Sequence, residues 1–251
     1  MSIQIFPLSE GVFTIGADKV FVPFDTQLHN LNERPTGSLL VEIQPFLVRL
    51  DNKNILLDTG LGYKNENGIL QIHANLSLLG IQAEEIDMVI LSHLHKDHAG
   101  GVSFENEKGV RQLSFPNAVY YVGKEEFNYG IDHKGLSYVT EDFSILEQSA
   151  QTEWLAQNGT IHPSIEYETA GGHCPFHQIF LFHHPEETLF FGGDIAPQLK
   201  QLKTKYIAKY DFDGRRSMEL RQQYADRGAK EHWTFLFYHD VQIPYAKLGV
   251  L

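Results

Sequence analysis

The chain has 251 residues and a net charge of −12, because 32 acidic side chains outnumber 20 basic ones. This balance argues against a nucleic-acid partner, since a phosphate backbone requires an excess of lysine and arginine, and more weakly against an anionic membrane surface. Cys174 is the single cysteine, which excludes an internal disulfide. The sequence shows neither the pattern of a signal peptide nor an apolar run of about 20 residues. We therefore expect one cytoplasmic domain over 1–251.

Apolar runs and turn residues predict many short strands and a few helices. In chain order the predicted strands are several short ones in 3–24, a hairpin of 38–50 with 54–58, then 88–91, 118–122, 165–169, 178–183, 188–191 and 233–237. The predicted helices are 69–80, a turn at 83–86, a short helix or turn at 123–129, about 141–156, and 213–228. The polar loop 25–37, the insertion 130–165 and the aromatic residues near the carboxyl end are predicted to shape a substrate pocket.

One loop concentrates potential metal ligands. His93, His95, Asp97 and His98 fall within six residues, directly after the apolar strand 88–91. His93 and His95 are two residues apart and project to the same side of an extended chain. Gly100 and Gly101 allow the turn that follows. Imidazole and carboxylate groups together suit zinc, iron or manganese.

Three more ligand-type residues follow strands far along the chain. His173 comes after a glycine pair, Asp194 after the strand 188–191, and His239 after the strand 233–237. The separations, about 75, 21 and 45 residues, are too long for local coincidence. Together with the loop they supply five histidines and two aspartates, which predicts a two-metal centre with a bridging carboxylate.

Other polar residues allow more than one interpretation. Asp58, after the strand 54–58, either caps a turn or supports the metal ligands from outside. Cys174 is expected to be a small buried residue, with a thiolate ligand or redox sensor as the alternative. Five other histidines are expected at the surface or in solvated turns: His73, His133, His162, His183 and His184.

The set His93-x-His95-x-Asp97-His98, with three downstream ligands and Leu57-Asp58-Thr59-Gly60 upstream, resembles the metallo-β-lactamase superfamily over nearly the whole chain. The resemblance implies an α/β fold, a four-layer α/β/β/α sandwich with two metals along one edge. It also implies roles: His93, His95 and His173 hold the first metal, Asp97, His98 and His239 hold the second, Asp194 bridges them, and Asp58 and His177 support the ligands.

Within the superfamily, the stretch Gly172–His177 resembles the G-H-T-P-G-H segment of the acyl-homoserine lactonase and methyl parathion hydrolase branch. Two residues depart from that branch. Cys174 stands where threonine or serine is usual. Pro197 replaces a tyrosine that, in the lactonases, follows the bridging aspartate by three residues and helps to hold the substrate carbonyl. Tyr238 is the candidate to take its place.

The expected function is that of a hydrolase in which a hydroxide bridging two divalent ions attacks a small ester, lactone or related substrate. Zinc is expected, with iron or manganese as alternatives. Asp97 and Asp194 are the expected catalytic carboxylates, and Asp97 passes a proton to the leaving group. The expected partner is a small molecule rather than nucleic acid or a membrane, and a homodimer is one allowed arrangement.

Alternative functions are open at this point. An iron-dependent oxidoreductase of the same fold is one, although diiron flavoproteins of this superfamily carry glutamate at the position of His95 and an added flavin domain. A nuclease is disfavoured by the acidic charge balance. A protein that binds metal and a ligand without turnover is the other alternative.

Overall fold

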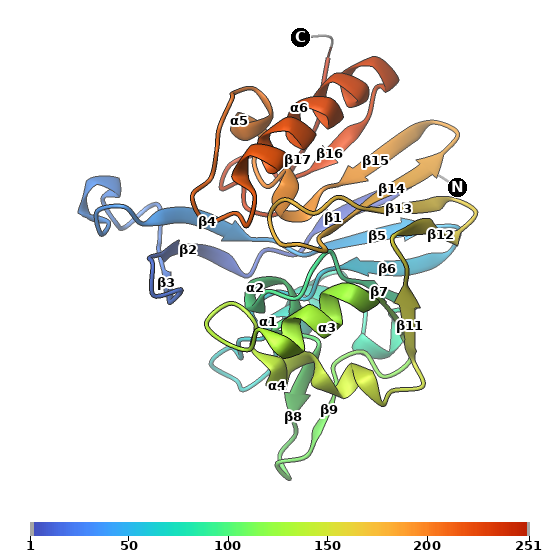
Figure 1. Ribbon diagram of the computed structural model, residues 1–251. Coiled ribbons are helices and arrows are strands. Elements are labelled where there is room, and N and C mark those ends of the chain that lie inside the picture. Colours follow the sequence, from blue (N-terminus) through green and yellow to red (C-terminus); the bar gives the residue numbers. More distant parts are fainter. Residues whose placement is uncertain (1–2, 250–251) are drawn as a thin grey trace.

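The computed structural model describes residues 3–249, and its main strands form two six-stranded sheets that pack face to face (Figure 1). The strand order of the first sheet is β1 (Gln4–Pro7), β5 (Phe46–Leu50), β6 (Lys53–Leu57), β7 (Met88–Ile90), β10 (Val119–Gly123) and β11 (Thr152–Leu155). The order of the second is β12 (Asn158–His162), β13 (Ile165–Thr169), β14 (Gln178–His184), β15 (Glu187–Phe191), β16 (Thr234–Leu236) and β17 (Tyr245–Lys247).

Helices cover the outer face of each sheet (Figure 1). On the first sheet these are α1 (Gln71–Leu78), α3 (Lys124–Asp132) and α4 (Thr140–Phe143); on the second it is α6 (Gly214–Glu231). The shorter helical turns are η1 (Leu31–Glu33), η2 (Ala83–Glu85), α2 (Lys96–Ala99), η3 (Ser144–Glu147), η4 (Gly193–Ile195) and α5 (Leu199–Leu202). Two small sheets join β3 (Phe21–Pro23), β2 (Gly11–Ile15) and β4 (Leu39–Ile43), and β8 (Ser103–Glu105) with β9 (Arg111–Leu113). Within residues 3–249, no helix combines the length and apolar character needed to cross a membrane.

The alternation of side chains along the strands produces three apolar layers. In the central layer, Val48 and Leu57 of the first sheet share a buried cluster with Phe182 of the second. Leu47 and Leu56, the sequence neighbours of that pair, point the other way and share a cluster with residues of α1 and α3. A third cluster joins the outer face of the second sheet to α6. The four-layer α/β/β/α sandwich is therefore confirmed.

Parallel strand pairs place the ends of several strands at one edge of the sandwich. β6 and β7 run parallel, with Leu57 opposite Ile90, and β15 and β16 run parallel, with Phe191 opposite Leu236. Strands that run parallel and in register end side by side. The segments that follow these four strands begin at Asp58, Leu91, Gly192 and Phe237, and they carry most of the predicted ligands.

Two predicted elements are wrong in part. The predicted helix 141–156 is α4 and η3 followed by β11, which pairs in parallel with β10. Phe143 and Leu146 are buried as a helix would bury them, but the β-branched and aromatic residues of Thr152–Leu155 suit the edge of a sheet better. The predicted strand 38–50 is two strands, because the chain breaks at Gln44 and Pro45 and β4 pairs with β2 in a separate sheet.

His73 is not solvated as predicted. It is half-buried on α1, its Nε2 lies 2.9 Å from the carbonyl oxygen of Ser114, and its ring makes edge contacts with Phe104 and Phe115. The helical pattern marked His73 as polar, but the contact with the segment around Ser114 depends on tertiary packing.

Candidate metal centre

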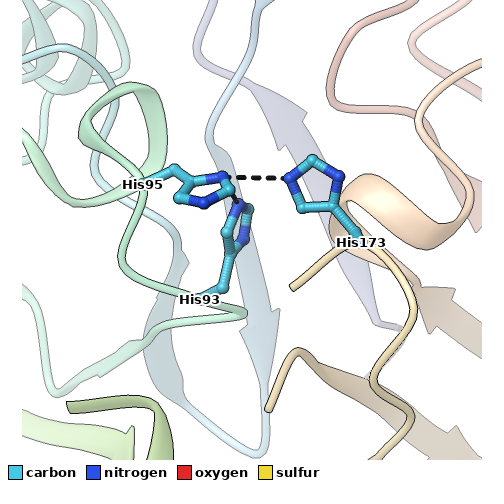
Figure 2. Close-up of side chains that lie close together, drawn as sticks. All are labelled: His93, His95 and His173. Atoms are coloured by element: carbon cyan, nitrogen blue, oxygen red, sulfur yellow. Dashed lines mark hydrogen bonds between the residues drawn. The ribbon is translucent and has the colours of Figure 1, made fainter. Parts of the chain in front are cut away.

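The first three predicted ligands converge on one point (Figure 2). His93 and His95 come from the loop after β7, and His173 comes from the loop between β13 and β14. His93 Nε2 lies 3.1 Å from His95 Nδ1, and His173 Nε2 lies 3.0 Å from the same atom. Three imidazole nitrogens that share so small a space form the donor set of a metal site.

A second group lies beside the first. Asp97 and His98 lie in α2, and His239 follows β16. Asp97 Oδ2 is 3.8 Å from His98 Nε2 and 3.6 Å from His239 Nε2. One ligand atom from each of these residues lies within 4.8 Å of the others. The structure therefore brings together the same three residues that the sequence resemblance assigned to a second ion.

Asp194 stands between the two groups, in η4 after β15. Its Oδ2 lies 3.1 Å from Nε2 of His173, in the first group. Its Oδ1 lies 3.2 Å from Nε2 of His98 and 3.0 Å from Nε2 of His239, in the second. One carboxylate thus presents a separate oxygen to each group, which is the arrangement of a bridging ligand.

Hydrogen bonds on the outer side of the rings fix the direction of each inner nitrogen. His98 Nδ1 donates to Asp58 Oδ2 at 2.7 Å, His173 Nδ1 to Asp211 Oδ1 at 2.8 Å, and His239 Nδ1 to the carbonyl oxygen of Glu42 at 2.7 Å. A neutral imidazole that donates through Nδ1 has its lone pair on Nε2. All three lone pairs therefore point toward Asp194, as metal-binding histidines require.

Asp58 supports both groups. Besides His98, it accepts hydrogen bonds from Ser92 N at 2.7 Å and Ser92 Oγ at 2.7 Å, and Ser92 Oγ lies 3.0 Å from His93 Nδ1. Because the serine hydroxyl donates to Asp58, it accepts from His93. Asp58 itself is fully buried, with a φ of 57°. His177, also fully buried, accepts the backbone N–H of Asp194 at 3.1 Å through its Nε2.

The polar atoms at the centre fit a cation. His98 Nε2 and Asp194 Oδ1 are buried and have no hydrogen-bond partner among residues 3–249, although they face each other at 3.2 Å. Burial opposes protonation of His98, yet the negative charges of Asp194, Asp97 and Asp58 raise its pKa well above the usual histidine value. Burial lowers the pKa of His93 and His95 well below that value. The carboxylates around His98 thus attract positive charge, which a bound cation would supply in place of the proton.

A buried cluster that the sequence did not indicate joins the two loops of the first group. Glu126 on α3 accepts hydrogen bonds from Leu94 N at 3.1 Å, from Tyr138 at 2.9 Å and from the Cys174 thiol at 3.3 Å. Burial raises the pKa of both Glu126 and Cys174, so the thiol stays protonated. Cys174 belongs to none of the ligand groups among the described residues. It is the small buried residue that the sequence predicted.

A cavity of about 360 Å³ opens onto the ligands His95, Asp97, His173, Asp194 and His239. Its walls come from residues of β2, the β2–β3 turn and β4, from Leu136 and Ser137 of the 130–165 insertion, and from the segment 197–210. The predicted loop 25–37 does not line it, but Gly37 lines one neighbouring hollow, and Thr26 and Leu31 line another. The prediction that aromatic residues near the carboxyl end shape the pocket is wrong for Phe235 and Phe237, because both lie in the core under α6.

Tyr238 does not reach the cavity either. Its side chain is fully buried, its ring stacks on His98 with centroids 4.0 Å apart, and its hydroxyl donates to the carbonyl oxygen of Asp97 at 2.6 Å. The structure therefore places Tyr238 behind the ligands, and the prediction that it contacts substrate fails on position. Tyr210 does line the cavity, with its ring centroid 6.2 Å from that of His173.

Comparisons with known proteins agree with this geometry. The chain matches the family model of the metallo-beta-lactamase superfamily over residues 42–239. An N-acyl homoserine lactonase, AttM, from Agrobacterium fabrum (strain C58) is 26% identical over 179 residues, which cover 65% of this chain and 61% of the lactonase. The chain thus spans less than two thirds of the length of that relative.

Two solved structures share the fold at low sequence identity. A probable metal-dependent hydrolase from Staphylococcus aureus superimposes with a TM-score of 0.80 at 22% identity, covering 98% of this chain and 92% of that one. AidC, described as a dizinc quorum-quenching lactonase, superimposes with a TM-score of 0.72 at 20% identity, covering 100% and 92% of the two chains.

Proposed function

Because this chain belongs to the metallo-β-lactamase superfamily, we propose that it is a dinuclear metal-dependent hydrolase of a small ester, lactone or related substrate. The observation that carries the proposal is the position of Asp194, whose two oxygens face two separate ligand groups at 3.0 to 3.2 Å. Relatives described as lactonases support the class of substrate.

Each proposed ion has three further donors. His93, His95 and His173 would hold the first, and Asp97, His98 and His239 the second. The donor set suits zinc, while iron and manganese share it. When bound, such a pair lowers the pKa of water toward 7 and polarises a carbonyl group. Zinc as the native metal, a cytoplasmic location and a homodimer stay predictions.

The side chains around the cavity have separate roles in this proposal. Asp97 lines the cavity and carries a proton to the leaving group. Tyr210 donates its hydroxyl to the substrate carbonyl, and so takes the part of the family tyrosine that Pro197 replaces. Burial raises the pKa of Tyr210 further above its usual value, which keeps the phenol protonated and able to donate. The apolar wall around Phe21 and Leu39 binds the rest of the substrate.

Elemental analysis with a substrate screen tests the proposal. Purified protein should contain two divalent ions per chain and should hydrolyse at least one of a lactone, an aryl ester, a phosphotriester and a β-lactam. Asp194→Ala and His98→Ala should abolish hydrolysis and lower the metal content toward one ion. Two full equivalents in both variants, or inactivity of the metal-loaded protein on all four substrates, would contradict it.

A further inference from the structure

Three lysines line the cavity of an otherwise acidic protein. Lys19 belongs to the turn between β2 and β3, Lys96 begins α2 directly after His95, and Lys200 lies on α5. They come from three distant parts of a chain whose net charge is −12. The acidic residues in the same wall are Asp97 and Asp194, both assigned above to the metal ions.

None of these ammonium groups forms an ion pair among residues 3–249, although the carboxylate of Asp142 interacts with Lys96 at longer range. In the part of the chain that the structure describes, no ion pair joins Lys19, Lys96 or Lys200 to a carboxylate, whereas Lys53 and Lys134 elsewhere both form one. Two of the three instead lie near aromatic rings of the same wall. Lys19 Nζ is 5.9 Å from the ring centroid of Tyr210, and Lys96 Nζ is 5.5 Å from that of Phe21.

The position of Lys19 carries backbone strain. Its φ is 58°, in the left-handed region that non-glycine residues rarely adopt. The turn is closed by a 3.1 Å hydrogen bond from Lys19 N to the carbonyl oxygen of Gly16. Strained residues of this kind persist where the surrounding structure holds them, and they are common at ligand-binding sites. Lys19 and Lys96 are also half-buried, so part of their hydration is lost, and among residues 3–249 no carboxylate forms an ion pair with either.

A buried arginine lies directly behind the same wall. Arg221 on α6 is 2% exposed, and it donates to Gln201 Oε1 and, at 3.2 Å, to the carbonyl oxygen of Tyr206. Gln201 and Tyr206 both line the cavity. Among residues 3–249 no carboxylate forms an ion pair with Arg221, and its Nε is buried without a hydrogen-bond partner. This guanidinium adds a second source of positive charge behind the wall, which Asp211 and Asp194 offset only from a longer distance.

We propose that the substrate of this hydrolase is an anion, an ester or lactone that carries a carboxylate away from the bond to be cleaved, and that Lys19, Lys96 and Lys200 bind this carboxylate. The inference rests on the proposed function and adds the substrate class. The apolar groups beside the lysines, Phe21 and Leu39, contact the carbon chain between the two ends of the substrate. Lysine side chains form strong charge-assisted hydrogen bonds to such a group when solvent is partly excluded.

A matched pair of esters tests the inference with the metal-loaded protein. Mono-4-nitrophenyl glutarate and 4-nitrophenyl valerate have acyl chains of equal length, and only the first has a free carboxylate. We expect kcat/KM to be at least about tenfold higher for the glutarate ester at low salt, a factor equal to one charge-assisted contact of about 1.4 kcal/mol. Raising the ionic strength to about 0.5 M should reduce this ratio because salt screens the lysines.

Lysine variants show which groups are responsible. Lys19→Met, Lys96→Met and Lys200→Met should each lower the ratio of the two kcat/KM values, and Lys19→Arg should restore it because it keeps the charge. Lys108→Met is the matched control: Lys108 is exposed in the turn between β8 and β9, outside the cavity, and its loss should leave the ratio unchanged. A ratio near one in the unmodified protein, or one that none of the three variants changes, overturns the inference.

Calorimetry separates this inference from the proposed function. If the metal-loaded protein hydrolyses neither ester nor any other substrate of the four-class screen, the proposed function is contradicted, but the binding of glutarate and valerate can still be measured. Both acids can reach a metal through one carboxylate, so a difference between them reports the second carboxylate. Glutarate binding about tenfold tighter than valerate, with the difference lost in Lys19→Met, supports the anion site. Equal affinities refute it.

Discussion

Asp58 offers the sharpest test of how the ligands are held. Its two oxygens accept three hydrogen bonds of 2.7 Å, two from Ser92 and one from His98. The substitution Asp58→Asn keeps the shape of the side chain, and asparagine tolerates the φ of 57° at this position. The amide, however, has one acceptor oxygen in place of two. In one orientation its NH2 group faces the N–H of His98, and in the other it faces the backbone N–H of Ser92.

The structure indicates how large each effect will be. Losing one buried, charge-assisted hydrogen bond costs about 1.5 to 3 kcal/mol of unfolding free energy. His98 can recover part of this in the metal-free protein by keeping a proton on Nε2, which lies 3.2 Å from Asp194 Oδ1. That proton occupies the lone pair that would bind metal. We therefore expect metal affinity at the His98 group to fall by about 10- to 100-fold, with a smaller loss of stability in the metal-free protein.

Two measurements separate these effects. Competition with a chromophoric chelator gives the zinc affinities of the two sites, and urea unfolding of the metal-free protein gives the stability. Asp51→Asn is the matched control, because Asp51 is exposed, also has a positive φ of 50°, and lies in the turn between β5 and β6. If Asp58→Asn binds two zinc ions as tightly as the unmodified protein, the role assigned to the outer hydrogen bonds is wrong.

Three further changes have defined outcomes. Gly101→Ala would place a Cβ atom 2.2 Å from the carbonyl oxygen of Thr59, so the metal loop must move; we expect a loss of about 1 to 3 kcal/mol in urea unfolding and weaker metal binding. Tyr238→Phe keeps the ring on His98 but loses the hydrogen bond to Asp97, which should cost about 1 kcal/mol and leave KM unchanged; a raised KM would mean that the hydroxyl reaches the substrate. Burial raises the pKa of Glu10 to about 8 from 4.5, against the hydrogen bond from Leu61 N. The contribution of protonated Glu10 to the unfolding free energy is therefore fully present below about pH 4.5. It falls as the pH rises toward 8, by at most about 1.4 kcal/mol per pH unit. In Glu10→Gln the urea midpoint should no longer depend on pH in this way, and an unchanged dependence would exclude Glu10 as its source.

The ligand positions were visible in the sequence because each follows a strand or a glycine turn with a strong local pattern. The strands that these apolar runs form end at Leu57, Ile90, Phe191 and Leu236, and their parallel pairing brings the next residues to one edge. The pattern needs no knowledge of the partner strand, since burial alone makes the strand apolar. The sandwich itself was expected from the resemblance to the metallo-β-lactamase superfamily, while the partners of β4 and β11 were not predicted.

The outer partners of the ligands left little trace in the sequence. Asp211 and Glu126 have other acidic residues beside them in the sequence, and only the fold shows that one bonds to His173 and the other to Leu94. The carbonyl oxygen of Glu42, which accepts from His239, has no side-chain signature at all. The sequence did not indicate the role of the cavity lysines either, because only the folded structure shows that a lysine forms no ion pair.

The segment between α5 and α6 links the two halves of the site. Tyr210 lines the cavity, and the next residue, Asp211, holds His173 Nδ1 at 2.8 Å. The backbone N–H of Phe212 also donates to the carbonyl oxygen of His173 at 2.9 Å. A shift of this segment therefore moves a ligand of the first group and a wall of the cavity together. Since Pro197 stands where lactonases of this branch carry their tyrosine, the segment that supplies Tyr210 also ties the proposed carbonyl contact to the geometry of the first metal.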